Sequence, residues 1–247
     1  MEIIKQNKLA ISILLLLSAA SLTSEIYAEV QEVETVTIIG TKADVKELPG
    51  SGTIVSNEEL QKAMDTDIHK ILSAVPGVYF RTEDGYGLRP NISIRGTSID
   101  RSAKITLMED GILVAPAPYT SSSAYYFPTT GRINSVEVLK GPSSISQGPS
   151  TIGGAINMIS TPIPEVASGK LTQEFGQNGM LRTHAYYGGV SGNFGGLVEV
   201  HEHQSDGFDS IANVGGDTGF DKSDFMMKAR YENGDHSLTF KMVEIDE

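Results

Sequence analysis

The residues with the clearest capacity for chemistry are two histidines, His201 and His203, in a run that reads as a β-strand. Side chains two positions apart lie on the same face of a strand, and Glu199 joins them there. Imidazole groups bind transition metals, but a third metal ligand is not evident. No serine–histidine–aspartate or paired-carboxylate arrangement stands out either. We therefore expect neither a metal centre nor an enzyme.

The composition narrows the classes of protein further. The chain has 247 residues, enough for one large domain or two small ones. It carries 19 Lys and Arg against 31 Asp and Glu, a net charge of −12, whereas a nucleic-acid binder needs a basic patch. It has no cysteine, which excludes disulfides, thiol nucleophiles and cysteine-ligated metals.

Residues 1–28 have the pattern of a secretory signal peptide. Lys5 and Lys8 precede an apolar run, Leu9–Ala20, that is too short to span a bilayer. Ala28 supplies a small residue at the expected cleavage point. The sequence thus predicts a chain that works outside the cytoplasm after cleavage, with a membrane anchor as the alternative.

The next stretch, residues 29–50, contains a β-branched run over Val33–Ile39. A short strand near a free terminus cannot build a core, but it can add to the edge of another protein's sheet through main-chain hydrogen bonds. The alternatives are an ordinary first strand or an unordered terminus.

Two short helices and a set of strands follow. Ser56 and Glu59 have the spacing of a capping box, and the second helix ends at Pro76–Gly77. Its buried face has the spacing i, i+3, i+4, i+7, with Ile68, Ile71, Leu72 and Val75. From Val78 the apolar period changes to two, and Asp110–Gly111 predicts a tight hairpin.

After Pro164 the sequence predicts five strands of alternating polar and apolar residues separated by turns. The predicted strands are Lys170–Phe175, Leu181–Tyr187, Gly196–Gln204, Asp224–Tyr231 and His236–Val243. This alternation fits an outer-membrane barrel meander, although a soluble sandwich would show it too. A membrane barrel needs at least about eight strands, so we expect these five to be the front part of a larger sheet.

The order of these segments resembles the plug of TonB-dependent outer-membrane receptors, over Glu34–Thr161. The motifs that carry the resemblance are "ILSAVPGVYF", "LMEDGILV" and "VEVLKGPSSISQGPSTIGGAINMIST". Within the family, the sequence is most similar to the ferric-citrate and siderophore receptors. The resemblance implies an α+β plug domain, a small mixed sheet with short helices, followed by the first antiparallel strands of an incomplete transmembrane β-barrel. The expected domains are a signal peptide (1–28), a periplasmic segment (29–50), the plug (51–164) and barrel strands (165–247).

The resemblance also assigns roles to residues. It implies that "ETVTI" is the TonB box, which pairs as an added strand with the inner-membrane energy transducer TonB; its residues are Glu34, Thr35, Val36, Thr37 and Ile38. It implies that Arg95 and Lys140 are plug cations that pair with carboxylates of the barrel. It places ligand contacts on outward-facing plug loops, where the candidates are Arg81, Arg89, Arg101, Tyr119, Tyr125 and Tyr126.

Arginines on these loops of an acidic chain favour an anionic ferric carboxylate chelate, because guanidinium pairs with carboxylate through two hydrogen bonds. Glu83 and Asp84, between Arg81 and Arg89, partly cancel this charge. The expectation is therefore a receptor that imports a ferric siderophore or ferric citrate, with no cofactor of its own and with outer-membrane lipid around it. The alternatives are an envelope β-protein or adhesin, and a lone plug-type periplasmic binding module.

Overall fold

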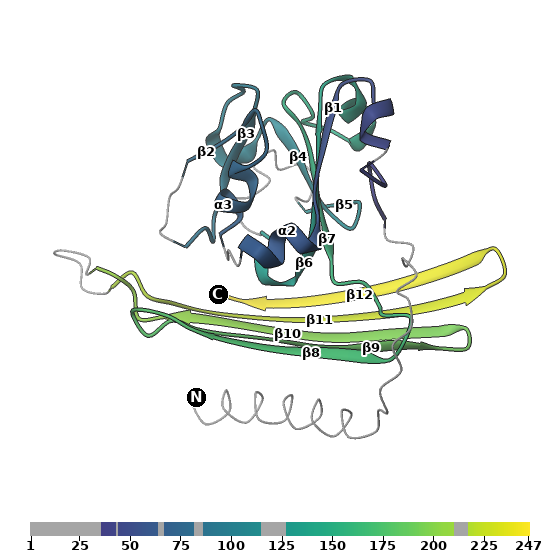
Figure 1. The fold of residues 1–247 in the computed structure, drawn as a ribbon. Helices are drawn as coiled ribbons and strands as arrows, with labels where there is room; N and C mark the ends of the chain where they lie inside the picture. The colour runs from purple at the N-terminus through teal and green to yellow at the C-terminus, as the bar shows by residue number, and fades with distance from the viewer. Residues whose placement is uncertain (1–35, 43, 64–66, 82–85, 115–126, 210–216) are drawn as a thin grey trace. The chain divides into compact units, whose positions relative to one another are not determined.

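The computed structural model describes residues 36–42, 44–63, 67–81, 86–114, 127–209 and 217–247. The chain divides into two compact units: one spans Glu34–Pro162, and the described part of the other spans Ile163–Glu247 (Figure 1). We call them the plug unit and the meander unit. Among the described residues, no helix combines the length and apolar character needed to cross a membrane. The expected signal peptide, residues 1–28, lies outside the described residues.

The plug unit is built on a five-stranded sheet in the order β1-β6-β7-β4-β5. Its strands are β1 Ser51–Val55, β4 Ile105–Glu109, β5 Ile112–Leu113, β6 Ile133–Lys140 and β7 Gly154–Ser160. β4 pairs with β7 in parallel, and the other neighbours are antiparallel. The mixed sheet expected of a plug is therefore confirmed.

A second, two-stranded sheet and several short helices complete this unit. The strands are β2 Val78–Arg81 and β3 Asn91–Ile94, and the α-helices are α2 Asn57–Ala63 and α3 Ile68–Ser73. The 3₁₀ helices are η1 Asp44–Glu47, η2 Asp100–Ser102, η3 Thr130–Arg132 and η4 Pro142–Gln147. The capping box is confirmed, because Glu59 Oε2 accepts the Ser56 amide at 2.8 Å and α2 begins at the next residue.

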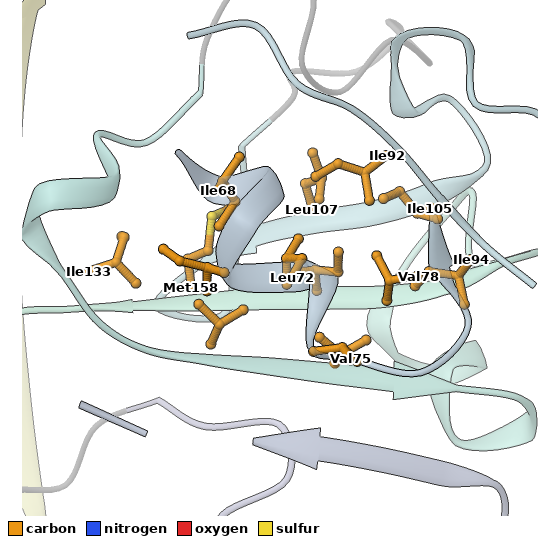
Figure 2. Close-up of a cluster of buried hydrophobic side chains, with 14 of the residues drawn as sticks. Ile68, Leu72, Val75, Val78, Ile92, Ile94, Ile105, Leu107, Ile133 and Met158 are labelled. Carbon is orange, nitrogen blue, oxygen red and sulfur yellow. The ribbon is translucent and has the colours of Figure 1, made fainter. Parts of the chain in front are cut away.

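The core of the plug unit forms where α3 packs with the sheet strands (Figure 2). The predicted burial of Ile68, Ile71, Leu72 and Val75 is confirmed, although the helix ends at Ser73, before the predicted stop at Pro76, and Val75 follows it. They pack with residues of both sheets, among them Ile94, Ile105 and Met158. Burial of each such side chain contributes about 1.5–3 kcal/mol relative to exposure, so this cluster holds the short helices on the sheet.

Glycines allow two close turns in the plug unit. Asp110 and Gly111 both have positive φ, 49° and 75°, and join β4 to β5 as the predicted hairpin. Gly154 has a φ of 150°, and a Cβ there would lie 2.3 Å from the carbonyl oxygen of Leu139 on β6. Within the glycine-rich stretch between β6 and β7, the 3₁₀ helix η4 lies between Gly141 and Gly148.

The meander unit is one antiparallel sheet in the order β12-β11-β10-β9-β8. Its strands are β8 Ser168–Phe175, β9 Leu181–Ser191, β10 Phe194–Ser205, β11 Phe220–Asn233 and β12 His236–Asp246. The five predicted strands are confirmed. All five are longer than predicted; in β10 and β11, glycine and charged residues at the ends continue the ladder, as Gly195 does opposite Arg230 and Lys222 does opposite His203.

The two faces of the meander sheet differ in the expected way. Apolar side chains are exposed on one face; among them are Leu171, Phe175, Val198, Leu238, Phe240 and Met242. Most residues at the alternate positions of β10 and β11 are polar and buried, and they include Glu199, His201, His203, Lys222, Asp224 and Lys228. Period-two alternation therefore runs through the central strands, with one face apolar and exposed.

Candidate functional site

The described part of the expected TonB box lies at the start of the plug unit. We call residues 36–40 the coupling segment. Val36 is 61% exposed and Thr37 is exposed. Ile38 is half-buried, because it packs against a hydrophobic cluster that contains Ile39 and Met108. Strand addition at the TonB box predicts that Val36 and Ile38 are exposed, with little packing on the plug. This prediction is wrong for Ile38, because its apolar side chain packs against that cluster. Glu34 and Thr35 lie outside the described residues.

A single buried carboxylate, that of Glu137 on β6, holds the main chain of this segment. Glu137 is 1% exposed. Its Oε2 accepts the Ile38 amide at 2.7 Å, and its Oε1 accepts the amides of Ile39 at 3.1 Å and Gly40 at 3.2 Å. Three successive N–H groups thus converge on one anion, which satisfies both the charge and the amides.

Asn157 on β7 extends this contact in two directions. Its Nδ2 donates to Glu137 Oε2 at 3.0 Å and to the Val36 carbonyl oxygen at 3.1 Å. Its Oδ1 accepts the amide of Gly111, in the β4–β5 turn, at 2.9 Å. A Cβ on Gly111 would lie 2.5 Å from Val36 Cγ1, so Val36 lies directly over this glycine. Sequence reasoning missed Glu137 and Asn157; the only local signal was a polar residue inside each of two apolar strands.

The two predicted plug cations lie near each other. Lys140 is buried at the end of β6, where its Nζ donates to the Pro76 carbonyl oxygen at 2.9 Å. Arg95 follows β3, is exposed, and has a φ of 54°. Burial, together with the charge of Arg95, lowers the pKa of Lys140. Within the described ranges neither cation has a carboxylate partner, and the expected pairing with barrel carboxylates stays a prediction.

The structure brings two of the three candidate ligand arginines to one end of the β2–β3 sheet. Arg81 ends β2 opposite Asn91, and the Asn91 Oδ1 accepts the Arg101 amide at 2.7 Å. Arg81 Nη2 lies 3.6 Å from Asp100 Oδ1, and both side chains are largely exposed. Asp100 therefore offsets part of the positive charge of Arg81. Ion pairs at the surface contribute little stability.

The remaining ligand candidates are less well placed in the structure. Arg89 is exposed in the segment between β2 and β3. Tyr119, Tyr125 and Tyr126 lie outside the described residues. Among the described residues, the expected cluster of ligand candidates therefore consists of three arginines. Arg81 and Arg101 both lie next to Asn91, and Arg89 lies on the segment that connects β2 to β3.

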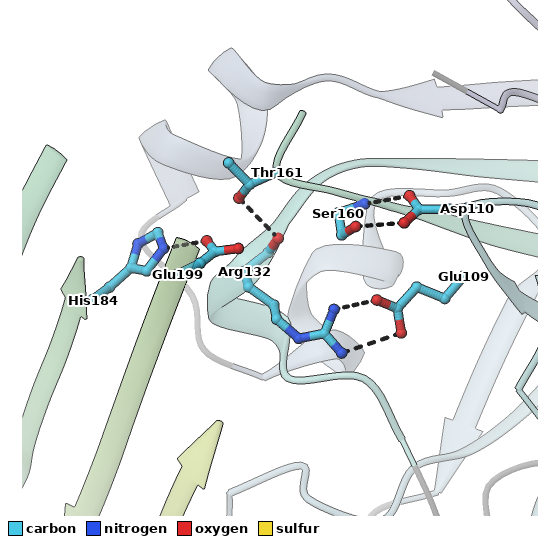
Figure 3. Close-up of polar contacts among 7 residues, drawn as sticks. All are labelled: Glu109, Asp110, Arg132, Ser160, Thr161, His184 and Glu199. Atoms are coloured by element: carbon cyan, nitrogen blue, oxygen red, sulfur yellow. Dashed lines mark hydrogen bonds and ion pairs between the residues drawn. The ribbon is translucent and has the colours of Figure 1, made fainter. Parts of the chain in front are cut away.

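Buried polar contacts fix the hairpin beside the coupling segment (Figure 3). Arg132 at the end of η3 pairs with Glu109 through two contacts, of which Nη2–Oε2 measures 3.2 Å. Asp110 accepts the Ser160 amide at 2.9 Å and the Ser160 hydroxyl at 2.5 Å. Thr161 donates through its amide to the Arg132 carbonyl oxygen at 3.1 Å. These contacts tie the β4–β5 turn to the ends of β6 and β7, and sequence reasoning missed them.

On the meander unit, the histidines noted from the sequence lie on one polar face together with His184 of β9. His184 Nε2 lies 2.6 Å from Glu199 Oε1 (Figure 3). The ring centroid of His184 is 5.9 Å from that of His201. His201 and His203 rings are 6.3 Å apart and meet edge to face. Among the described residues, no three His, Asp or Glu side chains converge as a metal site would require.

The fold agrees with comparisons to known proteins. Residues 44–155 match the family model of the TonB-dependent receptor plug domain. The chain is 25% identical over 226 residues to the vitamin B12 transporter BtuB of Photobacterium profundum, covering 89% of this chain and 36% of that protein. It is 29% identical over 155 residues to BtuB of Vibrio vulnificus, covering 61% of this chain and 25% of that protein. Residues 44–155 are thus similar to the plug domain of TonB-dependent receptors.

Solved structures share this fold. The ferric citrate transporter FecA in its unliganded form matches with a TM-score of 0.66 and 23% identity, over 84% of this chain and 33% of that one. The ferric yersiniabactin uptake receptor FyuA from Yersinia pestis matches with a TM-score of 0.66 and 24% identity, over 81% and 32%. The match extends beyond the plug into the antiparallel strands, and this chain spans about a third of each receptor's length. The expected architecture, a plug followed by strands of an unclosed barrel, is confirmed.

Proposed function

We propose that this chain forms part of a TonB-dependent outer-membrane receptor that binds a ferric chelate and imports it with energy from the inner membrane. The observation that carries the proposal is the succession, in one chain, of the plug domain and an antiparallel sheet whose exposed face is apolar. An apolar outer face suits lipid, whereas an adhesin or a lone periplasmic module would expose polar residues there. Cell fractionation tests this: recovery in the outer membrane supports the receptor, and recovery in the periplasm contradicts it.

Energy coupling would use the exposed start of the coupling segment. In this proposal the main chain of residues 34–38 pairs with a strand of TonB, and exposure of Val36 and Thr37 supports it. Replacing Val36 by Pro removes an N–H donor and blocks strand addition. We expect the Val36→Pro receptor to bind ligand normally but to lose uptake, while the matched Val36→Ile variant retains both. Equal loss of binding and uptake would count against the assignment.

The buried Lys140 supports the pairing of plug cations with the barrel. A buried ammonium beside a second cation is destabilising unless an anion neutralises it. We propose that carboxylates from the barrel of the complete receptor supply that charge to Lys140 and Arg95. The carbonyl oxygen of Pro76, which already accepts from Lys140, fixes the direction of the side chain.

For the ligand we propose an anionic ferric carboxylate chelate, bound near Arg81, Arg89 and Arg101. The three arginines are exposed, and guanidinium binds carboxylate through paired hydrogen bonds. The named relatives favour a second candidate, a corrinoid, because the curated proteins that match are vitamin B12 transporters. The chain itself would hold no cofactor in either case, since the iron or cobalt would arrive as cargo.

Titration of the receptor with ferric citrate, an uncharged ferric hydroxamate and cyanocobalamin separates these ligands. Arg89→Gln should weaken ferric citrate binding by about 1.5–3 kcal/mol, the value of a charged hydrogen bond, and leave the hydroxamate unchanged. Equal loss for both chelates, or for neither, would show that Arg89 is structural. Tight binding of cyanocobalamin alone would favour the second candidate.

A further inference from the structure

The turn that carries Arg101 has a strained main chain. Arg101 and Ser102 are consecutive non-glycine residues in the left-handed region, with φ of 47° and 57°. Both belong to η2, which lies between β3 and β4. Residues with a Cβ rarely adopt this conformation, and such strain persists only where the surrounding structure holds it. Residues held in this way concentrate at ligand-binding and active sites.

Two buried side chains hold this turn against the start of β3. Asn91 is 1% exposed, and its Oδ1 accepts the Arg101 amide at 2.7 Å. The hydroxyl of Ser102, which is fully buried, accepts the Ile92 amide at 2.9 Å and donates to the Pro90 carbonyl oxygen at 3.3 Å. An aliphatic side chain would fill position 91 at a lower desolvation cost, so the buried amide of Asn91 supports the turn and not the hydrophobic core.

These hydrogen bonds place Arg101 beside the end of β2. Asn91 is the strand partner of Arg81. Asp100, which precedes Arg101, lies 3.6 Å from Arg81 Nη2 through its Oδ1. The Arg101 side chain is exposed, and it has no carboxylate partner among the described residues. A carboxylate ligand can therefore bind Arg101 without displacing an ion pair, whereas at Arg81 it competes with Asp100.

We propose that Asn91 and Ser102 are positioning residues for the ligand: they hold Arg101 where its guanidinium and that of Arg81 bind the carboxylates of one anionic ligand. The inference rests on the proposed function, because it takes the two arginines as ligand contacts. Asn91 and Ser102 act through the main chain of η2 and touch no ligand themselves. Without their hydrogen bonds the two left-handed residues relax to an ordinary turn, and the Arg101 side chain loses its fixed direction. Fixing a long, flexible side chain before binding reduces the entropy lost on binding, which raises affinity.

The test is a titration of the full-length receptor with ferric citrate and with an uncharged ferric hydroxamate. Asn91→Leu keeps the size of the side chain but removes the acceptor of the Arg101 amide. We expect ferric citrate to bind about tenfold more weakly to this variant, and the hydroxamate to bind as before. Ser102→Ala should act in the same direction. The matched control is Ser144→Ala, which removes a buried hydroxyl that donates to the Gly141 carbonyl oxygen and should change neither affinity.

A double-variant cycle separates positioning from a general structural role. In the Arg101→Gln background, Asn91→Leu has no guanidinium left to position, so we expect no further loss of ferric citrate affinity. Losses that add, or equal losses for both chelates in the single variant, overturn the proposal. If Asn91→Leu does not fold, Ser102→Ala is judged by the same two criteria, and failure of both variants to fold overturns it.

Failure of the proposed function is a separate outcome. A wild-type receptor that binds no ferric citrate lacks the proposed ligand, and iron-free citrate then tests the two arginines as a carboxylate site. Citrate binding that Asn91→Leu and Arg101→Gln each weaken, with no further loss in the double variant, supports the positioning role. Absence of citrate binding, or citrate binding that Asn91→Leu leaves unchanged, overturns it.

Discussion

The plug unit and the meander unit use alternating strands in opposite ways. In the plug unit, apolar strand residues such as Ile94 and Ile105 are fully buried. In the meander unit, Leu171 and Phe175 are 68% and 78% exposed, whereas Glu199 is 1% exposed. The same period of two therefore reports strand geometry in both units but says nothing about which face meets solvent. That choice depends on whether water or lipid lies outside, and only the sheet context reveals it.

The units also differ in how they satisfy polar groups. The plug unit buries a few charges, each bound by specific partners, as Glu137 is by the coupling segment and Arg132 by Glu109. The meander unit buries charges too, among them Glu199, Lys222 and Asp224, and it pairs some of its charges between neighbouring strands, as in Arg182 with Glu174. Loss of one partner should be more costly in the Glu109–Arg132 pair, whose side chains are 7% and 0% exposed, than in the more accessible Arg182–Glu174 pair.

The largest expected effect comes from breaking the buried pair. Arg132→Met removes the cation that pairs with the nearly inaccessible Glu109 side chain, and we expect the plug to lose about 3–5 kcal/mol of stability. Denaturant-dependent hydrogen exchange of β4 and β7 amides in the full-length protein measures this loss. The double variant Glu109→Leu with Arg132→Met should recover most of it, and Arg81→Met, at an exposed pair, should change stability by less than about 0.5 kcal/mol. A double variant as unstable as the single one would show that Arg132 acts through packing and not through charge.

The next effect concerns the exposed apolar face. Met242 on β12 pairs with Met227 on β11, and Met227 pairs with Val198 on β10. Met242 therefore lies among the residues of the exposed apolar face. Met242→Arg should destabilise the assembled barrel by about 2–4 kcal/mol, the cost of a cation near the bilayer midplane. Thr239→Arg places the same cation on the opposite face of β12 and should cost much less. Folding free energies in lipid vesicles measure both, and equal costs would mean that this face does not meet lipid.

Local signals in the sequence were enough for much of the fold. The capping box at Ser56, the apolar face of α3 and the Asp110–Gly111 hairpin each depend on residues a few positions apart, and all three are confirmed. The five strands of the meander unit follow from the alternation and the turn residues between them. Contacts between residues a few positions apart follow directly from the spacing of residue types in the sequence. These elements could therefore be predicted without a structure.

The contacts of Glu137 and the buried Glu109–Arg132 pair could not be predicted in this way. Glu137 meets Ile39 across 98 residues and Arg132 meets Glu109 across 23, so no local spacing records either contact. Among the ligand candidates, Arg101 comes near Arg81 only because Asn91 binds its amide. The burial of Ile38 was missed for the same reason, since its hydrophobic neighbours lie on distant strands.

The smallest expected effect tests a purely local feature of the plug unit, the capping box of α2. Hydrogen bonds from the amide and hydroxyl of Ser56, together with Lys42, lower the pKa of Glu59 to about 2. A carboxylate with a depressed pKa adds stability above its unfolded pKa of 4.5, and this contribution disappears as the pH falls toward about 2. Because the Glu59 side chain is 53% exposed, solvent screening keeps the contribution of the charge small, less than about 1 kcal/mol.

Glu59→Gln isolates that charge, because glutamine can make the same capping contact but does not titrate. We expect the variant to be slightly less stable than wild type at pH 7 and equal to it near pH 2, with the difference closing below about pH 4.5. Denaturant unfolding of both proteins across this range measures the difference. Glu59→Ala removes the contact as well, so it should remain less stable than Glu59→Gln at every pH, by about 0.5–1 kcal/mol. A difference between wild type and Glu59→Gln that does not change with pH would mean that packing of the side chain, and not its charge, stabilises the start of α2.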